Sequence, residues 1–102
     1  MRNIIEGFPA SVRMALEPVL LNEKVKQVIL FGSRAFGDAD DRSDFDIAIS
    51  GPNITRAGLV GIWEELEKSN TLYKISISHL EPMPRDLRNR VLTTGIIIHE
   101  RA

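Results

Sequence analysis

The chain has 102 residues, of which 43% are hydrophobic and 26% are charged, and its formal net charge is −1. This length predicts one compact domain over residues 1–102, with no room for a second core. The near-neutral charge excludes a broad basic surface that coats nucleic acid, and the absence of cysteine excludes disulfides and thiolate chemistry. We expect a cytoplasmic protein, because the sequence shows no signal-peptide pattern and no run of about 18 apolar residues that could span a membrane.

The first predicted element is a helix. Proline suits the first helical position, so Pro9 can open it, whereas Pro18 should kink or restart it. The apolar positions of this helix recur at helical spacing: Val12, Leu16, Val19 and Leu20. The run from Val25 to Phe31 is β-branched and apolar, which predicts a strand that is buried on both faces and ends at Gly32.

Residues 44–50 alternate with the two-residue period of a strand. One face of this strand would carry Asp44, Asp46 and Ala48, and the other Phe45, Ile47 and Ile49. The segment 51–53 ends the strand, and Asn53 or Thr55 can cap the helix that follows. That helix has an amphipathic stripe made of Leu59, Ile62, Trp63 and Leu66.

The last third of the chain predicts a strand, a helix and a short strand. Residues 72–80 alternate again, and the polar face carries Lys74, Ser76 and Ser78. Pro84 can open a helix with Leu87 and Val91 facing inward, and residues 96–98 can return as a short buried strand. The order of elements predicts an α/β (α+β) fold: a small mixed β-sheet with helices packed mainly on one face.

The stretch from Phe31 to Asp46 carries the candidate chemistry. Gly32 ends a strand where a side chain would obstruct close approach, and Ser33 then offers a hydroxyl and a backbone N–H, a geometry that suits phosphate. Asp44 and Asp46 project from one strand face, where each carboxylate raises the pKa of the other unless a cation compensates. Magnesium takes one or two carboxylates together with substrate phosphates. The two halves of the stretch, the phosphate-binding turn and the carboxylate pair, therefore favour one site for nucleotide and metal.

Structural alternatives exist for each half of this stretch. Gly32 and Ser33 alone would be an ordinary strand-to-helix turn. Asp44 and Asp46 could be the solvated face of an edge strand, although acidic residues are depleted in strands. Three further carboxylates are interpreted as parts of a solvated loop without a role: Asp38, Asp40 and Asp41.

The spacing of Gly32-Ser33, ten residues and Asp44-x-Asp46 resembles the signature of the minimal nucleotidyltransferases in the DNA polymerase β-like superfamily. Four further residues also match that family's usual motif: Arg34, Ala35, Gly37 and Ser43. The resemblance implies that Gly32, Ser33 and Arg34 bind phosphate. It also implies that Asp44 and Asp46 are catalytic residues that position Mg²⁺, while an acceptor hydroxyl attacks the α-phosphorus of a nucleoside triphosphate, with ATP expected, and releases pyrophosphate.

The sequence departs from the family at two positions. The third carboxylate, which the family carries on the following strand, is replaced by Ser76, and Phe36 stands where the family often has a basic residue. A serine hydroxyl is neutral at pH 7 and cannot act as a carboxylate base.

Two functions therefore remain open. One is an enzyme that transfers a nucleoside monophosphate, expected to be AMP from ATP, to a hydroxyl of a protein or small molecule. The other is a catalytically weak or inactive nucleotide-binding partner, or antitoxin, of a HEPN-domain protein, because stand-alone members of the family often pair with such proteins and some add AMP to them. The small core also predicts a companion that covers apolar surface, either such a partner or a second copy of the chain.

Overall fold

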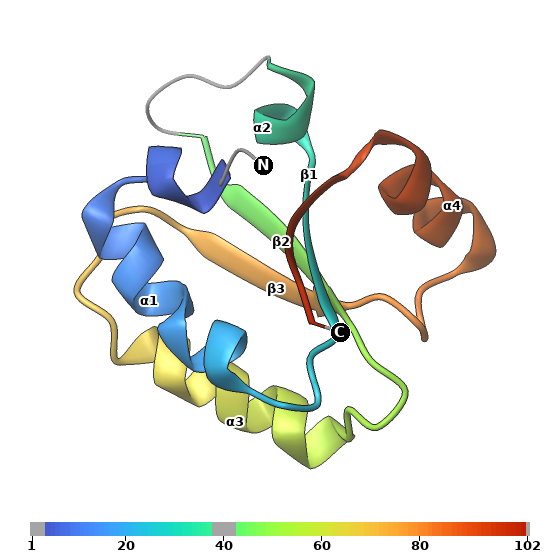
Figure 1. Ribbon diagram of the computed structural model, residues 1–102, viewed down its shortest axis with the longest axis horizontal. Helices are drawn as coiled ribbons and strands as arrows, with labels where there is room; N and C mark the ends of the chain where they lie inside the picture. The colour runs from blue at the N-terminus through green and yellow to red at the C-terminus, as the bar shows by residue number, and fades with distance from the viewer. Residues whose placement is uncertain (1–3, 38–42, 102) are drawn as a thin grey trace.

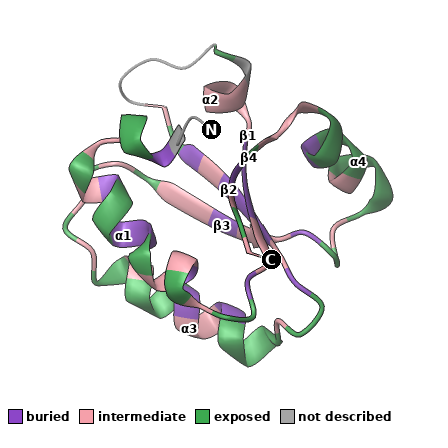
Figure 2. Cartoon of the chain, viewed as in Figure 1, coloured by how far each residue is buried: buried purple, intermediate pink, exposed green. Residues whose placement is uncertain are grey.

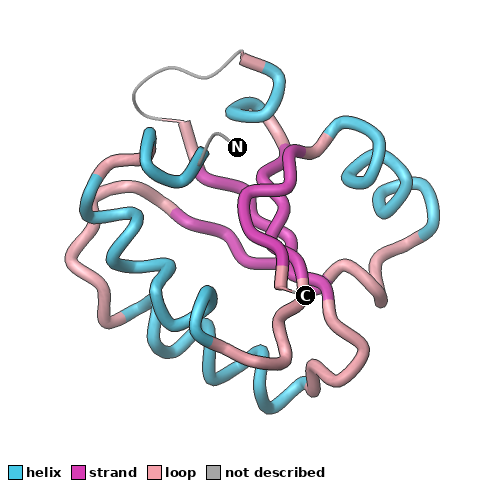
Figure 3. The backbone as a smooth tube through the Cα atoms, in the orientation of Figure 1, coloured by secondary structure: helices cyan, strands magenta, loops and turns pink. Residues whose placement is uncertain are grey.

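The computed structural model describes residues 4–37 and 43–101. Along these residues the elements follow in the order η1 (a 3₁₀ helix, Ile4–Gly7), α1 (Ala10–Leu21), β1 (Gln27–Phe31), α2 (Ser33–Phe36), β2 (Phe45–Ser50), α3 (Arg56–Glu67), β3 (Ile75–His79), α4 (Arg85–Thr94) and β4 (Ile96–Glu100). Figure 3 shows the strands gathered at the centre with the helices around them. Within the two described ranges, no helix has the length and apolar character that crossing a bilayer requires.

The strands form one mixed sheet in the order β3-β2-β1-β4. β1 runs antiparallel to both of its neighbours, β2 and β4, whereas β2 and β3 are parallel. A parallel pair needs a crossover connection, and α3 supplies it between β2 and β3. The predicted fold class, a small mixed sheet in an α/β arrangement, is therefore confirmed (Figure 1).

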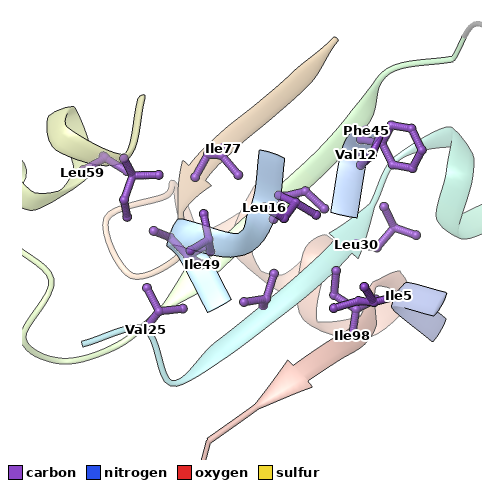
Figure 4. Close-up of a cluster of buried hydrophobic side chains, with 14 residues drawn as sticks. Ile5, Val12, Leu16, Val25, Leu30, Phe45, Ile49, Leu59, Ile77 and Ile98 are labelled. Atoms are coloured by element: carbon purple, nitrogen blue, oxygen red, sulfur yellow. The ribbon is translucent and has the colours of Figure 1, made fainter. Parts of the chain in front are cut away.

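The two faces of the sheet differ in what covers them. On one side, which we call the core face, α1 and α3 pack over the larger hydrophobic cluster, whose side chains Figure 4 shows in close-up. On the other side, the α4 face, α4 covers a smaller cluster of buried residues: Ile29, Ala48, Leu80 and Val91. Figure 1 shows α1 and α3 on one side of the strands and α4 on the other. Helices thus lie mainly on one face, as predicted.

Strand alternation divides the side chains of β2 between these two faces. Phe45, Ile47 and Ile49 are buried in the core-face cluster, and Ala48 belongs to the α4-face cluster. Because side chains alternate along a strand, Asp46 points to the same side as Ala48. The carboxylate of this strand therefore lies on the less covered face, and Figure 2 shows β2 and β3 changing between buried and intermediate along their length.

The prediction for the first helix was wrong in two details. Pro9 precedes α1 as its N-cap residue, and the helix does not restart at Pro18 but runs from Ala10 to Leu21. Pro18 removes the hydrogen bond that would have ended on the carbonyl of Met14. Since Met14 is 73% exposed, water can reach this turn and replace that bond.

Thr55, one of the two residues predicted to cap this helix, caps α3. Its Oγ1 accepts a hydrogen bond of 3.0 Å from the backbone N–H of Gly58. β3 is shorter than the predicted strand over 72–80. The register pairs with β2 begin at Ile75, although the carbonyl of Lys74 still accepts a hydrogen bond from the Phe45 N–H, and Leu72 is fully exposed. Leu87, which was predicted to face inward, is only partly covered and remains 41% exposed.

Candidate active site

Gly32 brings the end of β1 against a carboxylate of β2. The last residue of β1, Phe31, is the register partner of Asp46, so Gly32 leaves the sheet beside that aspartate. Gly32 has φ 75° and ψ −156°, and a Cβ atom added there would overlap Asp46 Oδ2. Glycine is required because only a residue without a side chain permits this conformation and this approach. Ser33 follows at once as the first residue of the single turn α2.

Asp44 and Asp46 differ in their surroundings. Asp44 is exposed directly before β2, whereas Asp46 is half-buried within the strand. Burial raises the pKa of the Asp46 carboxyl above its ordinary value of 3.8, the charge of Asp44 raises this pKa further, and Lys74 lowers it. Both causes of the rise disfavour the ionised carboxylate, and a bound cation would relieve the repulsion between the two aspartates.

β3 places a row of polar side chains on the other side of Asp46. Ser76 is the parallel register partner of Asp46, so both side chains point to the α4 face. Ser76 is half-buried, and Lys74 lies two residues earlier on the same face, exposed and close enough to influence the Asp46 carboxyl. The position that the resemblance assigned to a third carboxylate is thus a direct neighbour of Asp46 and carries a hydroxyl.

Arg34 lies against an aromatic side chain of the core face. Its guanidinium carbon is 3.8 Å from the centroid of the Phe45 ring and 5.6 Å from that of Tyr73, and its Nε donates a 3.0 Å hydrogen bond to the Ser43 carbonyl. Since Phe45 alternates to the core face, these ring contacts place the Arg34 guanidinium against the core-face side of β2. In this conformation Arg34 anchors the segment that leads into β2. Its predicted contact with phosphate stays a prediction.

The donor set of the site fits magnesium. Within residues 4–37 and 43–101, no group of three or more histidine, cysteine, aspartate and glutamate side chains could hold a metal ion by itself. Asp44 and Asp46 offer carboxylate oxygens, which magnesium prefers, and magnesium commonly takes only one or two carboxylates when phosphates and water supply the rest. The loop carboxylates Asp38, Asp40 and Asp41 lie outside the described residues.

Two features near the site were not predicted from the sequence. Lys74 received no role, although the alternation of its strand put it on the same face as Ser76 and so offered a signal. The other feature is a pocket of about 420 Å³ beside the end of β1. It is lined by Phe31, Gly32, Leu87, Arg90, Val91 and Thr94. No local sequence pattern predicts this pocket, because the residues on its two sides are more than 50 positions apart in the chain.

The comparisons with known proteins agree with this geometry. No curated protein sequence matches the chain. A chain of a toxin–antitoxin crystal structure with AMP-PNP superposes with a TM-score of 0.66 at 20% identity, covering 89% of this chain and 72% of that one. A chain of the Shewanella oneidensis complex of tri-AMPylated HEPN toxin with MNT antitoxin superposes with a TM-score of 0.62 at 18% identity, covering 99% and 74%. At these low identities the two superpositions show that the fold is shared.

The family model described as "Polymerase beta, Nucleotidyltransferase" matches residues 15–102, which run from within α1 to beyond β4. The matched region contains Gly32, Ser33, Asp44 and Asp46, which carry the motif on adjacent strand ends. The chain therefore belongs to the polymerase beta nucleotidyltransferase family.

Proposed function

We propose that the chain is a magnesium-dependent nucleotidyltransferase that transfers AMP from ATP to a hydroxyl of a protein or small-molecule acceptor. The observation that carries this proposal is the close approach of the Gly32 backbone to the Asp46 carboxylate. It joins the two halves of the motif, a phosphate-binding strand end and a carboxylate pair, in one place. A nucleotide bound at Ser33 can therefore reach the ion that Asp44 and Asp46 would hold.

Different residues of the chain would have separate roles in this transfer. Ser33 would bind the phosphates of ATP through its hydroxyl and backbone N–H. Asp44 and Asp46 would hold magnesium, which supplies charge neutralisation on the triphosphate when bound. The acceptor oxygen then forms a bond to the α-phosphorus, the bond from that phosphorus to the bridging oxygen breaks, and pyrophosphate leaves.

Ser76 limits how fast this transfer can run. The proton of the acceptor hydroxyl must leave during the reaction, and a serine side chain cannot take it as a carboxylate would. Because a positioned general base contributes about 10²–10⁴-fold, we expect slow transfer. This register position next to Asp46 is also the observation that favours the second candidate function, a weak or inactive nucleotide-binding partner of another protein.

The structural neighbours indicate which acceptor to test first. One of them is a complex of an AMPylated HEPN toxin with an MNT antitoxin, and another toxin–antitoxin structure holds AMP-PNP. We propose a HEPN-domain protein as the partner of this chain under either candidate function. Co-expression with a HEPN protein encoded nearby should give a complex that stays together on size exclusion, and clean separation of the two proteins would count against the partnership.

A calorimetric titration with ATP, with and without magnesium, tests the premise that both candidate functions share. We expect binding that depends on magnesium and that Asp44→Asn and Asp46→Asn each weaken. Glu17→Gln is the matched control, since it removes an exposed carboxylate of α1, a helix of the core face. If the aspartate variants bind ATP as tightly as the control does, the proposed site is wrong.

A further inference from the structure

The pocket beside Gly32 lies between the end of β1 and α4. Its volume of about 420 Å³ falls within the range of about 300–1,000 Å³ that is typical of sites for small organic ligands. Gly32 is both a wall of the pocket and the residue whose backbone lies against Asp46. The pocket therefore borders the proposed phosphate and metal site at Gly32.

The walls of the pocket are mostly apolar. Phe31, Leu87 and Val91 supply hydrocarbon surface, and Leu87 leaves 41% of its surface exposed. The polar side chains are those of Arg90 and Thr94, and the Thr94 hydroxyl already donates a 2.7 Å hydrogen bond to the Arg90 carbonyl. Such walls suit a flat ligand with apolar faces, and a guanidinium can add a stacking contact to an aromatic ring.

The position of the pocket decides which part of the reaction it serves. In the sheet, Asp46 has the end of β1 on one side and Ser76 of β3 on the other. The proposed phosphate-binding residues Gly32 and Ser33 lie on the β1 side, where the pocket also lies. The β3 side, with Ser76 and Lys74, is left for the acceptor. A nucleotide that places its phosphates at Ser33 thus has the pocket next to it, whereas an acceptor approaching across β3 does not.

We propose that this pocket receives the nucleobase and ribose of the nucleotide, an inference that rests on the proposed function. The base packs between the Phe31 and Leu87 side chains, and Arg90 contributes its guanidinium plane. None of the lining side chains is an amide or a carboxylate that could read the edge of a base. The Thr94 hydroxyl already donates to the Arg90 carbonyl, and Arg90 offers the plane of its guanidinium to the ring. Because strong discrimination requires hydrogen bonds to the edge of the base, ATP and GTP should bind with affinities within about tenfold of each other.

Calorimetry with two probes, magnesium ATP and magnesium tripolyphosphate, separates the base from the phosphates. Leu87→Gln should weaken ATP binding about tenfold, as expected for lost apolar contacts in a pocket, and leave tripolyphosphate binding unchanged. Leu92→Gln is the matched control, because Leu92 is a 55% exposed leucine of the same helix outside the pocket. If a thermal melt shows that Leu87→Gln does not fold, Leu87→Ala replaces it in the test, and a smaller loss of ATP affinity is expected.

The outcomes distinguish this inference from the proposed function. Selective loss of ATP affinity in the Leu87 variants supports the base pocket. Equal ATP affinity in the Leu87 and Leu92 variants overturns it, while magnesium-dependent tripolyphosphate binding would leave the phosphate and metal site standing. If the unmodified protein binds neither probe, both the proposed function and the pocket assignment fail.

Discussion

Replacing Gly32 by alanine tests the close approach on which the candidate site depends. Gly32 occupies a backbone region that is essentially restricted to glycine, and forcing another residue into it costs about 1–3 kcal/mol. The new methyl group would also overlap Asp46 Oδ2, so the carboxylate or the strand end must move. Because domains are typically stable by about 5–15 kcal/mol, the variant should still fold.

The expected effects can be stated for two measurements. A loss of 1 kcal/mol lowers the Tm of a domain of this size by about 4–8 °C, so a thermal melt of Gly32→Ala should show at least that decrease. The displaced carboxylate is one of the two proposed magnesium ligands. Disturbing the support of a metal ligand commonly costs about 10–100-fold in affinity, so magnesium-dependent ATP binding should weaken by that factor in calorimetry.

Gly37→Ala is the matched control. Gly37 also has a positive φ, 81°, but a Cβ atom added there meets no atom of the described residues within 4 Å. This variant should lose about 1–2 kcal/mol of stability through the left-handed backbone and keep its affinity for ATP. If Gly32→Ala binds magnesium ATP as tightly as Gly37→Ala, the contact with Asp46 is not part of the binding site and the reasoning fails.

Three further predictions concern other residues of the site. Asp46→Asn should raise the Tm at pH 7 without magnesium, with a gain in the free energy of unfolding of less than about 1 kcal/mol, because the raised pKa means that the ionised carboxylate opposes folding. The protonated form of Asp46 favours folding below pH 3.8, and this advantage is lost as the pH rises through the raised pKa, so the difference between the two melts should shrink on acidification. Ser76→Asp should restore a carboxylate beside Asp46 and so strengthen magnesium-dependent ATP binding or increase AMP transfer; no change in either would mean that the third position lies elsewhere. Arg34→Lys should lower the Tm by about 4–8 °C, since the stacking on Phe45 and the hydrogen bond to Ser43 together contribute about 1 kcal/mol; an unchanged melt would mean that these contacts add nothing to stability.

Local chemistry made several elements predictable from the sequence. The alternation of residues 44–50 separated the faces of β2 correctly, because a buried side chain must be apolar and the strand period is two. Thr55 was one of two candidate caps because its hydroxyl can accept a bond from the first turn. The motif from Gly32 to Asp46 also carried enough residue-specific chemistry to indicate its family before any geometry was known.

What the sequence could not predict depends on contacts between distant residues. Whether Pro18 breaks a helix depends on how the rest of that helix packs, and tertiary packing of α1 overrides the local cost. The exposure of Leu87 follows from where α4 docks, which local periodicity does not encode. Arg34 could be assigned to phosphate from its place in the motif, whereas its stacking on Phe45 depends on a side chain eleven residues later.

The sheet order has a consequence for the path by which the chain folds. β1 pairs with β2 across the connection 32–44, whereas its other edge pairs with β4, and the side-chain hydrogen bond from Gln27 to Glu100 spans 73 residues. Closing the longer loop costs more chain entropy and slows folding, so the β1–β2 pair should form first. That early pair contains Asp46 and is flanked directly by Gly32 and Asp44. The ion-binding half of the site should thus assemble early, and the α4 pocket only when the last strand docks.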